Sequence, residues 1–552
     1  MLCILTQQKR ALASAQLMIF FGPFWISFAQ TPLFMMRFFL LPLLFLSLLV
    51  VSSNCLHILG LFSHPAMSHF KFFQPIMRGL AEAGHSVDVI SPFRDEKPPK
   101  GYKDYLLPSA SLTDAIHLED FEHPFSFLAH YVEFFILYNM GKEACNTTLN
   151  SQALGEILKH PPGYYDVIMI EQFNTDCIMS VAHVLQAPVI GLSSCALAPW
   201  HYERLGLPLI PSYISALFQG KSQDMSLAER LGNWINVHSL NMLYKILNVP
   251  AGNALIRQRF GPDVPSTEEL VRNTSLMLIN QHYSMSGPKP LPPNVIEVGG
   301  VHITPPKPLP ADLQELLDKA AQGVILFSFG SQLKLSSLSE SRRDGIVRAL
   351  GRLEQQVILK WENETLPNKP RNLHIRKWLP QRDIMAHPNV RVFISHGGLM
   401  GTTEAVACGV PIVGVPIYGD QSLNVEALVQ RGMAVRLAFK ELDEESLYEA
   451  VTKAMDPTFK LRAKEVASAH NSRVQEPLET AIWWVEHVAE TRGAPLTQPS
   501  AVYLSRFVYH SLDVYLVVAL ILLIPVLTFM GLIRLCRGSK AGGSAKLKHK
   551  RM

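Results

Sequence analysis

Charged residues are scarce in this sequence. Lys, Arg, Asp and Glu make up 17% of its 552 residues, whereas hydrophobic residues make up 48%. The shortage of charge points to membrane segments, and the length is enough for two or more domains with cores of their own. The net charge of +4 is small, and no run of Lys and Arg interleaved with aromatic residues occurs in the body of the chain. The composition therefore gives no reason to expect a nucleic-acid partner.

Cysteine is also sparse, and the seven cysteines form no tightly spaced motif. Two of them, Cys3 and Cys536, lie outside the region that we expect to fold. The other five are an odd number, so we expect neither a disulfide framework nor a zinc site. The sequence also lacks an acidic cluster that would hold a catalytic metal.

The glycine-rich turn of dinucleotide-binding enzymes is missing as well. An NAD-dependent enzyme would carry Gly-x-Gly-x-x-Gly after a strand and an acidic residue about twenty positions later. Neither of the strand–helix units described below shows this pattern. This absence argues against an NAD-dependent enzyme.

Strand–helix–strand patterns, by contrast, are abundant. Residues 56–62 predict a short strand, residues 70–80 a helix with an apolar face, and residues 86–90 a second strand. Residues 165–170 predict another buried strand, and a helix and a strand over residues 187–192 follow it. This alternation predicts a doubly wound α/β domain, whose ligands gather outside the carboxyl ends of its strands.

Three titratable residues lie near those predicted strand ends. His69 comes after the first strand, and Glu171 and Asp176 come after the strand that ends at residue 170. Each therefore lies where chemistry is expected. Two aromatic-rich segments, residues 121–140 and 213–249, carry apolar residues at helical spacing. Core packing, a lipophilic pocket and contact with a membrane are all compatible with them.

A second domain follows a proline-rich linker. Residues 299–310 contain four prolines, which stiffen the connection and exclude regular structure. Residues 324–329 then predict a strand that runs into Ser331, and alternating strands and helices continue beyond it. Two helical patterns, residues 444–455 and 461–490, close the domain.

Residues 378–421 are the most informative part of the second domain. Residues 390–395 predict a buried strand, residues 401–408 a helix and residues 411–416 a further strand, with His396-Gly397-Gly398 at the first junction. Such a junction directs backbone N–H groups and the positive end of a helix at one point. That arrangement suits a phosphate group.

Side chains around this junction suggest the rest of the ligand. Trp378 could stack on a flat base, and His396 could donate a hydrogen bond to a phosphate oxygen. Glu404, Asp420 and Gln421 are acceptors suited to the hydroxyl groups of a ribose and a sugar. Together they describe a nucleotide-sugar.

The same segment resembles the donor-binding signature of the UDP-glycosyltransferases. His396, Glu404 and Asp420 lie 18, 26 and 42 positions after Trp378, and these spacings equal those of the family. A dozen fixed positions over some forty residues make the likeness specific. The matching positions are Phe393-Ile394-Ser395-His396-Gly397-Gly398, Gly401, Glu404, Pro411, Pro416 and Asp420-Gln421.

The resemblance implies an α/β fold of GT-B architecture, with two Rossmann-like doubly wound domains and a C-terminal transmembrane helix. The expected segments are an N-terminal extension and signal peptide (1–54), an acceptor-binding domain (55–300), a linker (301–320), a UDP-sugar donor-binding domain (321–495), a transmembrane helix (514–533) and a basic cytosolic tail (534–552).

The resemblance also implies a role for each donor-site residue. Many relatives have Asn where this chain has Met400, which removes a polar contact near the phosphates or the sugar. The family's reaction is inverting and metal-independent, with the UDP-sugar as a co-substrate and no cofactor. The implied contacts are Trp378 and Gln381 with uracil, Ser331, His396, Gly398 and Gly401 with the diphosphate, Glu404 with the ribose, and Asp420 and Gln421 with the transferred sugar.

Glycosyl transfer to a hydroxyl group needs a base, and an imidazole oriented by a carboxylate suits that task. His69 is the expected base, because its Ser-His-Phe context matches the family's catalytic histidine; His64 is the competing candidate. Asp176 is the preferred carboxylate, since the Asn-Thr-Asp-Cys segment around it resembles insect-type members. Glu171, which lies closer to the strand end, is the alternative.

The two ends of the chain predict targeting signals. Residues 514–533 carry no charge and are long enough to span a bilayer, and the basic residues after them predict a cytosolic tail. Lys548 and Lys550, fifth and third from the end, resemble a dilysine retrieval signal for the endoplasmic reticulum. Residues 37–53 resemble a signal peptide, so translation could begin at Met35 or Met36; an uncleaved anchor is the alternative.

This topology predicts a single-pass type I protein of the endoplasmic reticulum membrane with its catalytic domains in the lumen. Three glycosylation sequons, at Asn146, Asn273 and Asn363, fall in the expected lumenal region.

The expected function is transfer of a hexosyl group from a UDP-sugar to a hydroxyl group of a small lipophilic acceptor. The sequence of residues 395–405 resembles that of insect members, which favours glucose as the transferred sugar. No positively charged residue is assigned to a glucuronate carboxylate. UDP-glucuronate is the alternative donor. The rival from another class is a noncatalytic, membrane-anchored nucleotide-sugar-binding protein. A homo-oligomer stays an open option.

Overall fold

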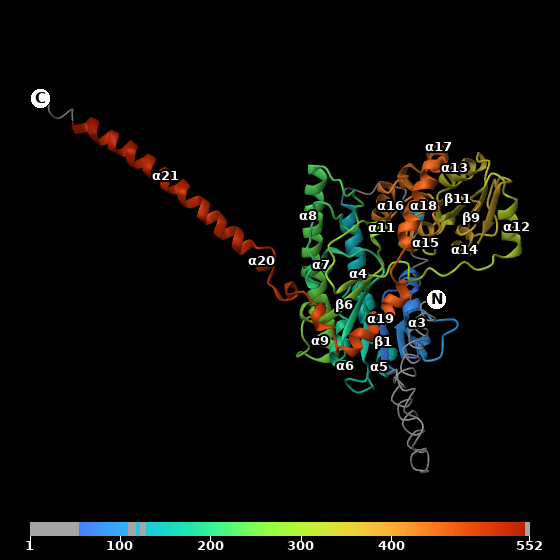
Figure 1. Ribbon diagram of the computed structural model, residues 1–552, viewed down its shortest axis with the longest axis horizontal. Coiled ribbons are helices and arrows are strands. Elements are labelled where there is room, and N and C mark those ends of the chain that lie inside the picture. The colour runs from blue at the N-terminus through green and yellow to red at the C-terminus, as the bar shows by residue number, and fades with distance from the viewer. Residues whose placement is uncertain (1–54, 109–116, 122–127, 547–552) are drawn as a thin grey trace, which may run out of the picture. The chain divides into compact units, whose positions relative to one another are not determined.

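The computed structural model describes residues 55–108, 117–121 and 128–546 (Figure 1). The expected N-terminal extension and signal peptide and the dilysine-like ending lie outside these residues. The described chain from Leu56 onward forms one compact unit, which contains two parallel sheets. We call the sheet of β1–β7 with its helices the N-terminal half, and the sheet of β8–β13 with its helices the C-terminal half.

The sheet of the N-terminal half has seven parallel strands in the order β3-β2-β1-β4-β5-β6-β7. Every residue of β4, β5 and β6 is buried, as expected for parallel strands covered on both faces. The strands are β1 (His57–Leu61), β2 (Ser86–Ser91), β3 (Tyr102–Leu106), β4 (Val167–Glu171), β5 (Val189–Ser193), β6 (Thr274–Ile279) and β7 (Val295–Glu297).

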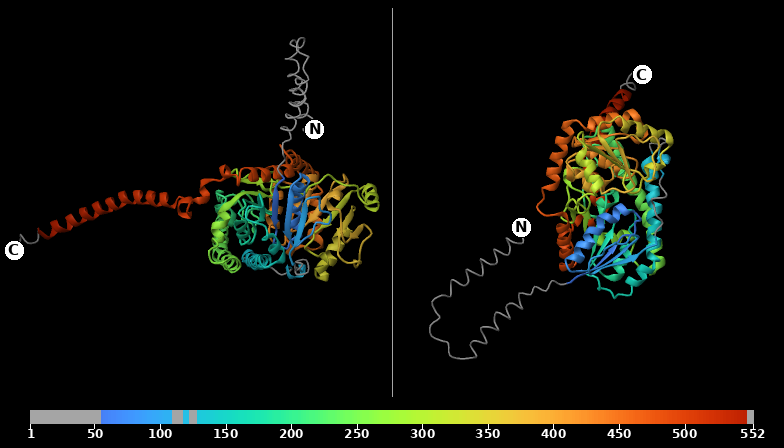
Figure 2. Two further views of the ribbon diagram at one scale, coloured as in Figure 1. Left: turned by 90° about the horizontal axis from the view of Figure 1, so that it is seen from below. Right: turned by 90° about the vertical axis from the view of Figure 1, so that its right-hand side faces the viewer.

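The sheet of the C-terminal half has six parallel strands in the order β10-β9-β8-β11-β12-β13. In the right-hand view of Figure 2 it is yellow to orange, and the first sheet is blue to green. The strands are β8 (Val324–Ser328), β9 (Gln356–Lys360), β10 (Leu373–Arg376), β11 (Val390–Ser395), β12 (Ile412–Gly414) and β13 (Ala434–Arg436). Both strand orders are those of doubly wound nucleotide-binding folds.

The α-helices alternate with these strands and cover the sheets. Those up to residue 286 are α3 (Met67–Glu82), α4 (Ala129–Leu149), α5 (Gln152–Ile157), α6 (Met179–Leu185), α7 (Pro199–Arg204), α8 (Leu227–Leu243), α9 (Val249–Phe260), α10 (Thr267–Leu270) and α11 (Tyr283–Ser286). The later ones are α12 (Ala311–Lys319), α13 (Glu340–Gly351), α14 (Gln381–Met385), α15 (Leu399–Cys408), α16 (Gln421–Gln430), α17 (Glu444–Ala454), α18 (Pro457–Asn471), α19 (Pro477–Glu490), α20 (Arg506–Tyr509) and α21 (Leu512–Lys546).

Helix α19 returns to the N-terminal half after the second sheet is complete. It packs against α3, and Ala481, Val485 and Val488 join the core around the first sheet (Figure 1). The expected donor-binding segment extended to residue 495 and so included this helix. Its packing depends on contacts across more than 400 residues of sequence, which no local pattern reveals.

Helix α21 is the long apolar helix expected at the C-terminus. Within its Leu512–Arg537 segment, an 18-residue window has a mean hydropathy of 2.9 and is not buried, so the helix is long and apolar enough to cross a membrane. Pro525 lies inside the helix, as membrane helices tolerate.

Candidate active site

His69 and Glu171 meet at the carboxyl end of the first sheet. His69 is the third residue of α3, which follows β1, and Glu171 is the last residue of β4, the neighbour of β1. The His69 Nδ1 atom lies 2.5 Å from Glu171 Oε1. Because a carboxylate can only accept a hydrogen bond, Nδ1 carries the hydrogen. The lone pair of the ring is then on Nε2, where it can take a proton from an acceptor hydroxyl group.

The His69 imidazole packs against two other rings, which also contact each other. The ring centroids of His64 and Phe173 lie 4.6 and 4.9 Å from that of His69. Burial, and then the neighbouring His69, lowers the pKa of His64 well below its usual value. His64, the competing candidate, therefore stays neutral and serves as a wall beside the histidine that has the carboxylate partner.

Asp176, the preferred partner of His69 in the sequence analysis, is engaged elsewhere. Arg204 Nη1 donates to its Oδ1 at 2.5 Å, and the Tyr244 hydroxyl donates to its Oδ2 at 2.7 Å. Both carboxylate oxygens are thus bound inside the N-terminal half. The expected pairing with Asp176 is wrong in this structure, because that residue lies five positions beyond the strand end and turns toward α7 and the segment after α8.

A disulfide joins Cys145 of α4 to Cys177, in the loop after Glu171. The sequence analysis expected no disulfide framework and did not anticipate this single bond. The two residues are 32 positions apart and form no local spacing motif. The helix also approaches this loop closely at Gly141, where an added Cβ would lie 2.3 Å from the Asn174 carbonyl oxygen. Helix α4 is thus fixed to the loop that follows the candidate catalytic carboxylate.

His396 lies in the turn between β11 and α15 of the C-terminal half. Added Cβ atoms would lie 2.9 Å from its ring at Gly330 and 2.4 Å from its Nε2 at Gly398, so glycine at both positions makes room for the imidazole. Burial lowers the pKa of His396 to about 4, so the ring is neutral and has one N–H to donate. Its Nδ1 has no hydrogen-bond partner among the described residues. Ser331, exposed, follows Gly330.

The candidate base-binding and ribose-binding residues meet at the start of α14. Gln381 Nε2 donates to Glu404 Oε2 at 2.6 Å, and burial raises the pKa of Glu404. Gly401 lies next to this pair, since an added Cβ there would be 3.1 Å from Gln381 Nε2. Trp378, three positions before Gln381, is 72% exposed and so offers an open ring face for stacking.

Asp420 precedes α16 and is tied to the His396 turn. Asn424 Nδ2 donates both to Asp420 Oδ2 and to the Gly397 carbonyl oxygen, each at 3.0 Å. Gln421 differs from its expected role, because its side-chain oxygen already accepts from the N–H groups of residues 417 and 418 at 2.8 and 3.1 Å. Only its amide nitrogen is then available for a sugar.

The two halves bring His69 and Asp420 toward each other. Burial raises the pKa of Asp420, while Asn424 and the nearby His69 oppose that rise. The base candidate of the N-terminal half and the sugar-binding candidate of the C-terminal half are therefore near enough to interact electrostatically.

A residue that the sequence analysis missed also spans the two halves. Glu133 of α4 accepts a hydrogen bond from the Gly419 N–H at 2.9 Å, directly before Asp420. Its only sequence signal is that it is one of two acidic residues within the aromatic-rich segment 121–140. No motif marks it, because its partner is 286 positions away.

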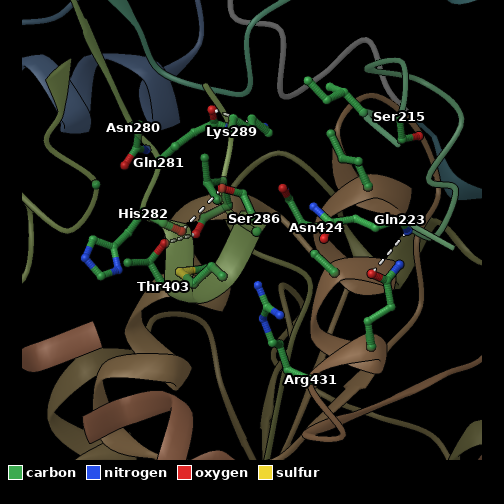
Figure 3. Close-up of a pocket in the computed structure, with 18 of the residues that line it drawn as sticks. Ser215, Gln223, Asn280, Gln281, His282, Ser286, Lys289, Thr403, Asn424 and Arg431 are labelled. Atoms are coloured by element: carbon green, nitrogen blue, oxygen red, sulfur yellow. Dashed lines mark hydrogen bonds between the residues drawn. The ribbon is translucent and has the colours of Figure 1, made fainter. Parts of the chain in front are cut away.

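A pocket runs along α16 (Figure 3). Asn280, Gln281 and His282, which follow β6, form one wall, and α15 and α16 form another. Lys289 Nζ lies 3.5 Å from Gln281 Oε1 in this pocket. Met400 is close by, since Asn280 Nδ2 lies 3.6 Å from its sulfur atom. The thioether thus fills space where relatives with Asn would have an amide.

The three sequon asparagines, Asn146, Asn273 and Asn363, are all exposed. In the described part of the chain, no group of three or more His, Cys, Asp or Glu residues is arranged to hold a metal ion. The catalytic, donor-binding and glycosylation roles of the named residues stay predictions.

Comparison with known proteins agrees with this geometry. Residues 109–542 match the family described as "UDP-glucoronosyl and UDP-glucosyl transferase". The chain is 33% identical over 489 residues to "UDP-glycosyltransferase UGT5" of Dactylopius coccus, covering 85% of this chain and 90% of that protein. It is 29% identical over 470 residues to "UDP-glucuronosyltransferase 2B16" of Oryctolagus cuniculus, covering 81% and 88%.

Solved structures show the same architecture. "Spinosyn Forosaminyltransferase SpnP" superposes with a TM-score of 0.54 at 17% identity, covering 79% of this chain and 99% of that one. "Glycosyltransferase VinC in complex with DTDP" has a TM-score of 0.54 at 16% identity, covering 79% and 100%. These likenesses confirm the two-sheet GT-B fold. Together with the match along most of the sequence, they show that the chain belongs to the family of UDP-glucuronosyl and UDP-glucosyl transferases.

Proposed function

We propose that this enzyme transfers glucose from UDP-glucose to a hydroxyl group of a small lipophilic acceptor, with His69 as the base and Glu171 as its partner. The observation that carries the proposal is the 2.5 Å contact between His69 Nδ1 and Glu171 Oε1. It leaves Nε2 directed to the chemistry and places a buried carboxylate behind the ring, where it stabilises the imidazolium as that forms.

The reaction is a single displacement. The acceptor oxygen forms a bond to the anomeric carbon as its proton passes to His69 Nε2. The bond from that carbon to the diphosphate breaks on the opposite face, and UDP leaves with the electron pair, so the configuration inverts. The N–H groups at the start of α15 and the neutral His396 stabilise the charge on the departing diphosphate. We propose that no metal ion takes part.

An apolar cluster in the N-terminal half reaches the helix that follows Asp420. Phe134 of α4, Trp200 of α7 and Leu240 of α8 belong to it and are buried, and Leu423 of α16 packs against it. These contacts are core packing, so the lipophilic nature of the acceptor is proposed from the likeness to the family.

We further propose an endoplasmic reticulum location, with α21 in the membrane and both sheets in the lumen. The Cys145–Cys177 disulfide supports an oxidising compartment, and the three exposed sequon asparagines are compatible with it. A glycosidase-sensitive mass shift that is lost in Asn146→Gln, Asn273→Gln or Asn363→Gln tests the topology. No shift at any of the three sites would argue against a lumenal location.

The test of function is UDP release from the full chain in membranes, with a panel of lipophilic phenols and UDP-glucose or UDP-glucuronate in turn. We expect turnover with UDP-glucose and loss of it in His69→Ala. Faster turnover with UDP-glucuronate would reverse the donor assignment, and activity in His69→Ala would remove the base assignment. UDP binding without transfer from either donor would favour the noncatalytic binding protein.

A further inference from the structure

Glu133 connects the two halves of the protein beside the candidate sugar site. Its Oε2 accepts the Gly419 N–H at 2.9 Å, and Gly419 has a φ of 68°, in the left-handed region that favours glycine. This turn leads directly into Asp420. The carboxylate of α4 thereby holds the loop that presents Asp420, although it belongs to the other half of the molecule.

Two carboxyl groups therefore lie close together, and little positive charge opposes them. Burial, and then Asp420, raises the pKa of Glu133 to about 7, with the Gly419 N–H acting against the rise. Burial also raises the pKa of Asp420, which Asn424 and His69 oppose. No Lys or Arg side chain of the described residues is among the groups that shift either pKa.

The cations of the pocket along α16 do not change this balance. Arg431 follows the last residue of α16 and is about 10 Å along the helix from Asn424, at a rise of about 1.5 Å per residue. Its guanidinium group donates to the carbonyl oxygens of Ser284 and Tyr283 at 3.0 and 3.1 Å. Lys221 and Lys289, which also line the pocket, are likewise absent from the groups that act on Glu133 and Asp420.

We propose that Glu133 is a specificity-determining residue, whose charge beside Asp420 selects UDP-sugars with a neutral hexose and rejects those with a hexuronate. This inference rests on the proposed function, in which Asp420 holds the transferred sugar. A hexuronate carries a carboxylate at C6, so in this subsite a third negative charge would enter a partly desolvated space next to two others. Like charges so placed repel strongly, whereas the C6 hydroxyl group of glucose can donate to a carboxylate.

Glu133→Gln separates the charge of this side chain from its hydrogen bond. The amide oxygen of Gln still accepts from the Gly419 N–H, so the loop before Asp420 keeps its anchor. Glu143→Gln is the matched control, because Glu143 lies on the same helix and is exposed. Glu133→Ala removes both the charge and the hydrogen bond and so reports the positioning contribution.

The experiment compares kcat/KM for UDP-glucose and UDP-glucuronate, with one phenol acceptor at pH 8.5, in the full chain and these variants. We expect Glu133→Gln to raise the ratio for UDP-glucuronate over UDP-glucose by about tenfold or more, mainly through KM for UDP-glucuronate. Glu143→Gln should leave the ratio unchanged. Calorimetry with each UDP-sugar should show the same change in relative affinity, independently of turnover.

Three results would overturn the inference. The first is an unchanged ratio in Glu133→Gln when the enzyme is active. The second is loss of both activities in Glu133→Ala with an unchanged ratio in Glu133→Gln, which would make Glu133 a positioning residue only. The third is a wild-type preference for UDP-glucuronate. A fourth result would separate the two proposals. If neither donor supports transfer, but calorimetry still shows tighter binding of UDP-glucose than of UDP-glucuronate, the proposed function is overturned and the charge selection remains.

Discussion

The candidate site residues of the two halves of the protein come from the chain in different ways. Most of the candidate donor site comes from one stretch of 44 residues, 378–421, in which a strand, a glycine turn and a helix place the side chains by local geometry. The candidate catalytic pair comes from residues 102 positions apart, and the contact between Glu133 and Gly419 from residues 286 positions apart. Local geometry is recorded in sequence spacing, whereas long-range pairing depends on where two elements pack.

Helix α4 links these two kinds of site. One end is bound to the loop after Glu171 by the Cys145–Cys177 disulfide, and Glu133 lies about 18 Å along the helix from Cys145, at a rise of about 1.5 Å per residue. There it holds the loop before Asp420. A change at either end of α4 should therefore affect the N-terminal half and the position of the loop before Asp420. Binding of the uracil base, which belongs to the C-terminal half, should be unchanged.

The largest effect that distinguishes the two halves is expected at Glu171. Glu171→Gln removes the charge behind the imidazole, so kcat/KM should fall by about 10²–10⁴-fold while UDP binding persists. Steady-state kinetics and calorimetry with UDP measure the two quantities. Asp176→Asn is the contrast, because Asp176 does not touch His69. A larger catalytic loss in folded Asp176→Asn than in Glu171→Gln would restore Asp176 as the partner.

The next effect is on stability and belongs to Asp176. Asp176 and Arg204 are buried together, so Asp176→Ala leaves an unpaired cation and should lower the free energy of unfolding by about 3–5 kcal/mol. Denaturant unfolding in detergent measures it. The double variant Asp176→Ala with Arg204→Ala should lose less than the sum of the single variants. Full additivity would mean that the pair contributes no coupling.

Removal of the disulfide should have a smaller effect. Cys145→Ser with Cys177→Ser should lower the free energy of unfolding by about 2–4 kcal/mol, because the unfolded chain is no longer constrained. The measurement is unfolding with and without a reductant. A reductant should destabilise the wild type and leave the double variant unchanged, while equal sensitivity of both proteins would show that the disulfide does not form. Affinity for UDP should stay the same below the transition.

The same contrast explains what the sequence could predict. The doubly wound domains and the apolar C-terminal helix follow from patterns within short windows. The partner of His69 did not follow. Glu171 ends β4 and Asp176 lies five positions beyond it. Only the packing of α7 and of the segment after α8 shows that Arg204 and Tyr244 bind Asp176.

Residues without a local pattern escaped prediction for the same physical reason. The spacing of 32 positions between Cys145 and Cys177 does not indicate that they pair. Only the packing of α4 against the loop after β4 brings them together. From its place in the chain, helix α19 is expected to end the second domain. In the structure its Ala481 and Val485 pack beside α3, in the core around the first sheet. In both cases the deciding contact lies between elements whose order in the chain does not determine their neighbours.

The smallest effect, and the one that joins both halves, is a dependence of donor selection on pH. The pKa of Glu133 is raised to about 7, so the group is ionised above that pH and neutral below it. Asp420 and the Tyr418 hydroxyl interact with it electrostatically. Burial, then Asp420, then Glu133 raises the pKa of Tyr418, which therefore stays neutral in this range.

As the pH falls from 8 to 6, the preference for UDP-glucose over UDP-glucuronate should decrease several-fold, because the repulsion of a hexuronate weakens when Glu133 gains a proton. Competition between the two donors at each pH measures this ratio, in which the protonation of His69 cancels because both donors use the same base. Glu133→Gln should give a flat profile at the low-pH level, whereas a slope that persists in this variant would assign the titrating group to Asp420.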